Sequence, residues 1–213
     1  MNTSEGTLAA LQAHPLVAIL RGVTPAEILA VADTLVDAGW RSIEVPLNSP
    51  EPFTSIERLA ARFGSGIVLG AGTVLGAADV RRCADAGARL VLAPNRDADV
   101  IRTARALGLV VMPGVATPSE AFEALAAGAQ ALKLFPADVL GPASFKGWRA
   151  VLPAGVPLFA VGGVDAGNLH AFRGAGAAGA GLGSSLFAPG RRLDDLRSRA
   201  LALAAAWAQQ PAV

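Results

Sequence analysis

The chain has 213 residues, of which 53% are hydrophobic and 16% charged, and its formal net charge is +1. This length suits one domain with a sizeable core, and the near-zero charge gives no electrostatic reason to expect nucleic acid or an anionic membrane surface as a partner. The single cysteine, Cys83, excludes an internal disulfide framework and fits a cytoplasmic protein, and no apolar run reaches the roughly 18 residues of a membrane helix.

One pattern recurs along the chain: a short apolar strand, a turn, and an amphipathic helix that ends near a glycine. Short apolar runs bounded by turn residues are typical of strands buried on both faces. The pattern predicts eight strands, over Leu16–Leu20, Ser42–Leu47, Ile67–Gly72, Leu90–Pro94, Val110–Gly114, Ala131–Phe135, Leu158–Gly163 and Ala178–Gly183.

Helices are expected between these strands, for example over residues 25–39 and 77–87, and residues 191–210 form the last one. Thr24-Pro25 and Thr117-Pro118 each place a capping residue before a proline at the first helical position. Four helix ends are marked by glycine, a residue that favours the left-handed conformation found there: Gly39, Gly87, Gly108 and Gly128.

Eight strands that alternate with helices predict parallel βαβ units, and eight such units close into a (β/α)8 TIM barrel. We expect a single domain over residues 1–213, with a short helical extension before the first strand. An open doubly wound sheet is the competing architecture. The strand count, the even spacing and the lack of a nucleotide fingerprint favour the barrel.

Lys133 is the most unusual residue of the predicted strands, because the chain has only one other lysine, Lys146. Strand side chains alternate, so Lys133 points into the barrel if Leu132 and Leu134 pack outward against helices. Burial there lowers the pKa of the amine, and a neutral amine can attack a ketone to form an imine. The alternative is a buried lysine paired with a carboxylate for structure.

Glu44 is a second ionisable residue within a predicted buried strand. In the strand over Ser42–Leu47, Glu44 lies on the same face as Ser42 and Pro46, and therefore also points into the barrel. A carboxylate beside an amine in a dry site can move protons through water. Because both groups lie near the active end of the barrel, chemistry is favoured over a plain ion pair.

Two glycine-rich turns follow the last two strands. Barrels commonly bind phosphate at this place, through backbone N–H groups that glycine leaves accessible. Ser184 adds a hydroxyl donor. The turns therefore predict a phosphate site, formed by Gly162, Gly163, Gly183 and Ser184.

Other polar residues follow the remaining strands. Arg21, after the first strand, has a guanidinium suited to a carboxylate or phosphate, or is simply a solvated loop residue. Thr73 either binds substrate or caps the following turn, and Asn48 and Asn95 are equally ambiguous. The two histidines, His14 and His170, form no cluster with a metal-ligand spacing, so no metal is expected.

These motifs together resemble the family of 2-keto-3-deoxy-6-phosphogluconate and 6-phosphogalactonate aldolases. The resemblance covers residues 15–190 and rests on "AILRGVTP", "IEVPLNSP", "GAGTVL", "PGVATPSEA", "ALKLFPADVLGP", "FAVGGV" and "GAGLGSSLF". It implies a class I aldolase, a carbon–carbon lyase that needs neither metal nor cofactor and is usually a homotrimer.

The resemblance also implies residue roles. Lys133 matches the Schiff-base lysine and Glu44 the proton-transferring carboxylate. Arg21 and Thr73 match positions that hold the pyruvyl end of the substrate. The phosphate site of the family matches the two glycine turns and Ser184.

The substrate branch follows from two positions. Asn48 stands where the gluconate-specific branch has an arginine, and Val161 stands where it has a threonine. Valine removes a hydrogen-bond partner from one face of the C4 hydroxyl, the group at which the two substrates differ. We therefore expect 2-dehydro-3-deoxy-6-phosphogalactonate as substrate, in galactonate degradation.

Alternative functions remain open from the sequence. Within the family, the gluconate epimer or 4-hydroxy-2-oxoglutarate would be the substrate. Outside it, a phosphate-binding barrel isomerase or epimerase would use Glu44 to abstract a proton, with Lys133 stabilising charge only. A sugar-phosphate binding protein without turnover is the last alternative.

Overall fold

The computed structural model describes residues 3–209. The strands are β1 (Leu16–Ile19), β2 (Ser42–Pro46), β3 (Val68–Gly72), β4 (Leu90–Leu92), β5 (Val110–Met112), β6 (Gly114–Val115), β7 (Leu132–Leu134), β8 (Leu158–Val161) and β9 (Gly179–Leu182). The helices are α1 (Thr3–Ala13), α2 (Ile28–Asp37), α3 (Pro52–Phe63), the 3-10 turn η1 (Gly64–Gly66), α4 (Ala77–Asp85), α5 (Ala98–Ala106), α6 (Pro118–Ala126), α7 (Ala137–Arg149), α8 (Leu169–Gly174) and α9 (Leu193–Ala208).

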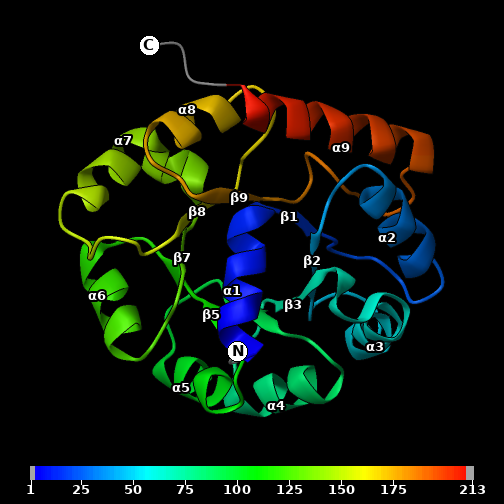
Figure 1. The fold of residues 1–213 in the computed structure, drawn as a ribbon, viewed down its shortest axis with the longest axis horizontal. Helices are drawn as coiled ribbons and strands as arrows, with labels where there is room; N and C mark the ends of the chain where they lie inside the picture. Colours follow the sequence, from blue (N-terminus) through cyan, green and yellow to red (C-terminus); the bar gives the residue numbers. More distant parts are fainter. Residues whose placement is uncertain (1–2, 210–213) are drawn as a thin grey trace.

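The strands form one parallel sheet in the order β5-β4-β3-β2-β1-β9-β8-β7-β6. The two ends of this order, β5 and β6, are consecutive in the chain and are joined by Pro113 alone, so the sheet closes on itself. The helices after the strands form a ring outside it (Figure 1). The predicted (β/α)8 barrel is confirmed, and the open doubly wound sheet is not found.

The fifth predicted strand is interrupted, which gives nine strands in residues 3–209 instead of eight. Its first half, β5, pairs with β4, and its second half, β6, pairs with β7. Pro113 separates the halves because proline has no amide hydrogen to donate, although its carbonyl accepts a 3.0 Å hydrogen bond from the Lys133 amide. Gly114 follows because a Cβ there would lie 2.2 Å from the Pro94 carbonyl oxygen.

Helices α2, α4, α5 and α6 end in the same way. At the end of α2 the Trp40 amide donates to the Leu35 carbonyl and the Gly39 amide to the Val36 carbonyl, each at 3.0 Å, as in a Schellman motif. This motif needs a left-handed residue, and all four predicted glycines have positive φ: Gly39, Gly87, Gly108 and Gly128. The predicted helix ends are confirmed.

One of the two predicted helix starts is wrong. Thr117 caps α6 as predicted, in a capping box with Glu120. Helix α2, however, begins at Ile28, after a turn in which the Glu27 carboxylate accepts hydrogen bonds from the Thr24 amide (2.9 Å) and hydroxyl (3.1 Å). The proline at position 25 therefore starts a turn rather than the helix.

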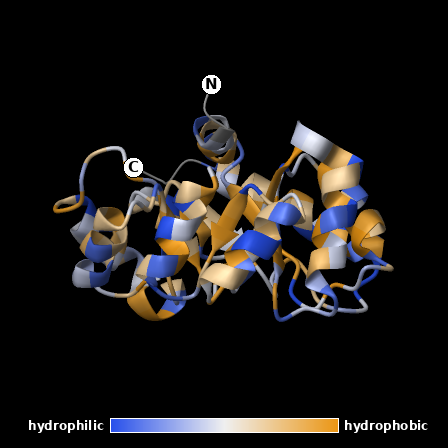
Figure 2. Cartoon of the chain, turned by 90° about the horizontal axis from the view of Figure 1, so that it is seen from below, coloured by the Kyte–Doolittle hydropathy of each residue, from blue (hydrophilic) through white to orange (hydrophobic). Residues whose placement is uncertain are grey.

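Two apolar layers follow from the alternation of the strand side chains. Leu132 and Leu134 face outward into the layer between sheet and helices, together with Ile43 and Val45. A second layer fills the barrel and consists of Leu11, Val17, Ile19, Val68, Leu90, Leu92, Val110, Met112, Ala131, Phe159 and Val161. Figure 2 shows the hydrophobic strands at the centre of the molecule.

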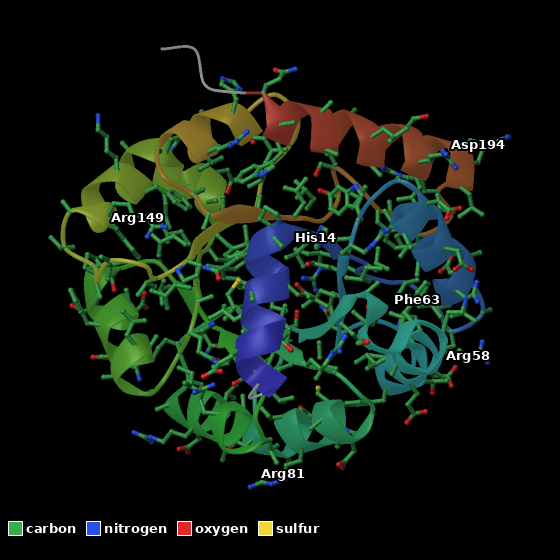
Figure 3. The ribbon with its side chains drawn as sticks, in the orientation of Figure 1. His14, Arg58, Phe63, Arg81, Arg149 and Asp194 are labelled. Carbon is green, nitrogen blue, oxygen red and sulfur yellow. The ribbon has the colours of Figure 1, made fainter. Side chains whose placement is uncertain are left out.

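Helix α1 is the predicted helical extension, and it lies across one end of the barrel (Figures 1 and 2). Its Leu11 is fully buried and belongs to the layer inside the barrel. Around the ring, Arg58, Arg81 and Asp194 extend outward from their helices (Figure 3). Between residues 3 and 209 no helix has the length and apolar character needed to cross a membrane.

Removing the Leu11 side chain should destabilise the barrel from the end that α1 covers. We expect Leu11→Ala to lower the free energy of unfolding by about 2–4 kcal/mol, because a buried leucine leaves a cavity. Leu201→Ala on α9, where the side chain is 50% exposed, should change it by less than about 0.5 kcal/mol. Denaturant unfolding measures both; equal effects would show that α1 does not stabilise the barrel.

Candidate active site

Lys133 lies on β7 and points into the barrel, as predicted. Its side chain is 6% exposed, and its Nζ lies 5.2 Å from the centre of the Phe135 ring. The neighbouring Leu132 and Leu134 pack outward, which leaves the interior face to Ala131 and Lys133. Burial lowers the pKa of the Lys133 amine; the charge of Glu44 opposes this shift and that of Arg21 adds to it.

Glu44 lies on β2 and is 2% exposed, inside the same barrel. Burial raises the pKa of its carboxyl, against the opposing charges of Lys133 and Arg21. A Cβ at Gly72, on the neighbouring strand β3, would lie 1.6 Å from Glu44 Oε1. The carboxylate therefore occupies the space that the missing side chain of Gly72 leaves.

The Lys133 and Glu44 side chains share the interior without a direct ion pair. No salt bridge joins them among residues 3–209, and Glu44 Oε2 is buried without a hydrogen-bond partner in that part of the chain. A purely structural pair would be expected to satisfy both groups by contact. The arrangement instead leaves Glu44 Oε2 unpaired, and neither group is satisfied by direct contact with the other.

A cavity of about 160 Å³ opens at the carboxyl ends of β1, β8 and β9. Six of the predicted site residues line it together, and they come from the ends of β1, β8 and β9: Arg21, Val161, Gly162, Gly163, Gly183 and Ser184. The cavity therefore unites the predicted phosphate turns with the cationic Arg21. Lys133, Glu44 and Thr73 are not among its lining residues.

Arg21 is exposed and follows β1. Its Nη1 donates a 2.6 Å hydrogen bond to Asn48 Oδ1, from the loop after β2. The guanidinium is thus held by a neutral group, and among the described residues no acidic side chain forms a salt bridge with it. Its positive charge remains available to an anion that enters the cavity.

Thr73 follows β3 in a strained conformation. Its φ is 56°, in the left-handed region that a β-branched residue rarely adopts, at a cost of about 1–3 kcal/mol. Helix α4 begins four residues later, and its N-cap is Gly76. Thr73 therefore does not cap that helix, and such strain is typical of residues fixed in an active site.

The two glycine turns are built for close approach of the backbone. Gly162 and Gly163 have φ of 97° and 64°, and a Cβ at Gly163 would lie 2.2 Å from Asp138 Oδ2. Ser185 ties the two turns together, because its hydroxyl donates a 2.8 Å hydrogen bond to the Val164 carbonyl. At Gly183 a Cβ would meet nothing within 4 Å, so this turn faces open space.

Sequence reasoning missed several residues of the site. Ile19, Phe135, Val164 and Gly181 also line the cavity, and Gly72 gives Glu44 its space. The alternation of strand side chains could have identified Ile19 and Phe135, which lie two residues from Arg21 and Lys133. Nothing local in the sequence indicates that Gly72 serves Glu44, because the two meet across neighbouring strands.

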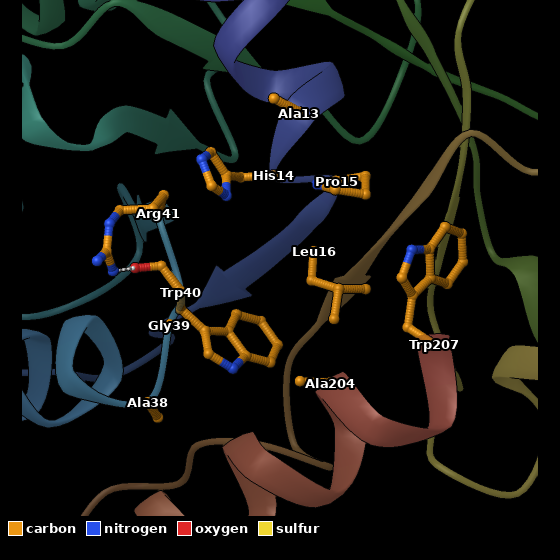
Figure 4. A pocket seen from close by; sticks show the side chains of 10 residues that line it. All are labelled: Ala13, His14, Pro15, Leu16, Ala38, Gly39, Trp40, Arg41, Ala204 and Trp207. Atoms are coloured by element: carbon orange, nitrogen blue, oxygen red, sulfur yellow. Dashed lines mark hydrogen bonds between the residues drawn. The ribbon is translucent and has the colours of Figure 1, made fainter. Parts of the chain in front are cut away.

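A second cavity, of about 250 Å³, lies at the opposite end of the barrel (Figure 4). Trp40 and Trp207 line it, and the nearby polar groups bind the protein's own backbone: Trp40 Nε1 donates to the Ala200 carbonyl, and Arg41 donates to the Val36 and Trp40 carbonyls. His14, exposed just after α1, lies at its edge. These bonds explain the polar groups of Trp40 and Arg41 as structural.

The other histidine, His170, lies in α8. Within residues 3–209 no group of three or more histidine, cysteine, aspartate or glutamate side chains could hold a metal ion. Asn95 follows β4 and is exposed, outside the cavity lining. Among the predicted site residues, the ionisable groups are the Lys133 amine, the Glu44 carboxyl and the Arg21 guanidinium.

The chain is similar over most of its length to known proteins. The family model for KDPG and KHG aldolase matches residues 8–196. The probable 2-dehydro-3-deoxy-6-phosphogalactonate aldolase of Rhizobium meliloti (strain 1021) is 50% identical, over 91% of this chain and 92% of that protein. The 2-dehydro-3-deoxy-6-phosphogalactonate aldolase of Escherichia coli (strain K12) is 46% identical, over 91% of this chain and 94% of that protein.

The chain is also similar to a solved structure in three dimensions. The structure described as native KDPGal superposes with a TM-score of 0.89 at 46% identity, over 91% of this chain and 94% of that one. The resemblance noted in the sequence thus extends over nearly the whole barrel. The chain belongs to the KDPG and KHG aldolase family.

Proposed function

We propose that this protein is a class I aldolase that cleaves 2-dehydro-3-deoxy-6-phosphogalactonate to pyruvate and glyceraldehyde 3-phosphate. The observation that carries the proposal is the buried Lys133 amine beside Glu44, with no direct ion pair between them in residues 3–209. Membership of an aldolase family and about 50% identity to galactonate-branch proteins support the substrate.

The reaction begins at Lys133. Burial lowers the pKa of its amine, so that a larger fraction is neutral and nucleophilic near pH 7. The amine attacks the C2 ketone of the substrate and forms a carbinolamine. Glu44, through a water molecule, delivers the proton with which the C2 hydroxyl leaves as water, and a protonated imine forms.

Cleavage then uses Glu44 as a base. The carboxylate takes the C4 hydroxyl proton, again through water, and the electrons of the C3–C4 bond move into the protonated imine to give an enamine. C4 leaves as the aldehyde of glyceraldehyde 3-phosphate. The raised pKa of Glu44 brings it closer to the working pH, as suits a group that takes and returns a proton. Protonation at C3 and addition of water release pyruvate and the free amine.

The two ends of the substrate are assigned to different residues. Arg21 binds the pyruvyl carboxylate, Thr73 helps to hold the pyruvyl end, and the backbone N–H groups of the glycine turns bind the phosphate with Ser184. Val161, 5% exposed, forms an apolar wall next to C4. This wall offers no hydrogen bond to the C4 hydroxyl and selects the epimer whose hydroxyl points elsewhere.

We also propose that the protein acts as a homotrimer in the cytoplasm. Several large apolar side chains on different elements support association between copies. Val139 is 79% exposed, Leu75 58% and Phe122 46%, which is apolar surface that a partner could cover. The single cysteine supports a reducing compartment.

Imine formation is tested with pyruvate and sodium borohydride. The wild type should gain one reduced pyruvate group on Lys133, and Lys133→Met should gain none while its circular dichroism spectrum is unchanged. The chain supplies its own control, because Lys146 is the only other lysine and is exposed. Lys146→Met should label like the wild type. A wild type without adduct would favour the isomerase.

The pH dependence tests the coupling of the two groups. The negative charge of Glu44 raises the pKa of Lys133, so Glu44→Gln should lower that pKa further. The rate of pyruvate labelling should fall, on acidification, at a pH below 10.5 in the wild type and at a lower pH still in Glu44→Gln. Turnover of Glu44→Gln should drop by about 10²–10⁴-fold. A shift of the acidic limb to higher pH would contradict this coupling.

Substrate selection is tested at Val161. Val161→Thr adds a hydrogen-bonding hydroxyl to the apolar wall, and should raise kcat/KM for the gluconate epimer relative to the galactonate epimer by about tenfold. Val161→Ala, which changes only size, should reduce both values alike. Steady-state kinetics with both epimers measure the ratio. An unchanged ratio in Val161→Thr would remove Val161 from the selection of substrate.

A further inference from the structure

The feature that the proposed mechanism leaves unused is the hydrogen bond between Arg21 and Asn48. Arg21 is an exposed, flexible side chain, and such a side chain loses considerable rotamer freedom when it is fixed on a ligand. The 2.6 Å bond from its Nη1 to Asn48 Oδ1 removes part of that freedom before substrate arrives. Arg21 is thereby held where it lines the cavity beside Val161 and the glycine turns.

Asn48 itself stands on a rigid turn. The Leu47 amide donates to the Gly72 carbonyl at 2.8 Å, and the Ser49 amide donates to the Pro46 carbonyl at 3.0 Å. Ser49 is 7% exposed, and its hydroxyl accepts a 3.0 Å hydrogen bond from the Gly22 amide. The loops after β1 and β2 are therefore joined twice, by Asn48 to Arg21 and by Ser49 to the residue after it.

The anchor is neutral, and this matters for an arginine that must bind an anion. An amide oxygen fixes one N–H of the guanidinium without cancelling its charge, whereas an aspartate or glutamate would compete with the substrate. That charge reaches the reacting pair, because Arg21 lowers the pKa of both Glu44 and Lys133. Displacement of the guanidinium would therefore change the pKa values of Glu44 and Lys133 as well as the affinity of the site for the substrate carboxylate.

We infer that Asn48 is a positioning residue, which holds the Arg21 guanidinium at the mouth of the cavity and leaves its charge free for the carboxylate of the substrate. The inference rests on the proposed function, since it takes the substrate to be a 2-keto acid. Asn48 acts through Arg21 and does not itself touch the reacting atoms.

A double-mutant cycle tests whether Asn48 acts through Arg21. Asn48→Ala should raise the KM for pyruvate in the condensation reaction by about tenfold, with kcat changed less than twofold, because one charge-assisted hydrogen bond is lost. Arg21→Ala should raise it more, by about 100-fold. The double variant should match Arg21→Ala alone. If the increases in KM of the two single variants multiplied in the double variant, or if Asn48→Ala kept the wild-type KM, the inference would be overturned.

Two further variants separate position from charge and from loop structure. Asn48→Asp keeps the acceptor but offsets the charge of Arg21, so its KM for pyruvate should also rise; a wild-type KM would overturn the role given to a neutral anchor. Ser49→Ala removes the parallel bond to Gly22 and not the bond to Arg21. Its effect on KM should therefore be the same with and without Arg21→Ala. If Ser49→Ala coupled to Arg21→Ala as strongly as Asn48→Ala does, both residues would act only by stabilising the loops, and the inference would be overturned.

The failure of the inference can be told apart from the failure of the proposed function. Borohydride labelling with pyruvate is carried out on the same wild-type preparation. No adduct in the wild type would overturn the aldolase proposal and, with it, the substrate carboxylate that Arg21 is meant to bind. An adduct on Lys133 together with multiplying losses in the cycle would overturn the Asn48 inference alone.

Discussion

An amine and a carboxylate share the dry interior of this barrel, and neither is neutralised by direct contact with the other. Burying two ionisable groups costs several kcal/mol for each, which a structural ion pair offsets only with good geometry and further hydrogen bonds. Here the charge of each group offsets only part of the cost of burying the other, so the pKa of Glu44 stays raised and that of Lys133 stays lowered. The closed sheet, the two apolar layers and the covering helix α1 supply the hydrophobic stabilisation that lets the fold keep such a pair.

The sequence predicted the architecture well because its signals are local. Alternation in Ala131–Phe135 and Ser42–Leu47 placed Lys133 and Glu44 inside the barrel, since successive strand side chains point to opposite faces. The four helix-ending glycines were correct for a similarly local reason, because each helix requires a left-handed residue at that point. The family resemblance then gave these positions chemical roles that strand geometry alone could only suggest.

What the sequence could not predict depends on contacts between distant residues. The strand break at Pro113 arises because its two halves pair with different neighbours. Asn48 was ambiguous until its bond to Arg21, 27 residues away in the chain, was visible. Each of these outcomes is decided by a partner that no window of local sequence contains.

Because the Glu44 carboxylate fills the space beside Gly72, the residues at positions 44 and 72 limit which substitutions the other can accept. The carboxylate occupies the volume that any side chain at position 72 would need. While position 44 is a glutamate, almost any substitution of Gly72 would therefore clash with it. A shorter residue at position 44 can come first, because it would leave room for a methyl group at position 72. An engineer who wishes to place a side chain at position 72 must therefore also shorten the residue at position 44.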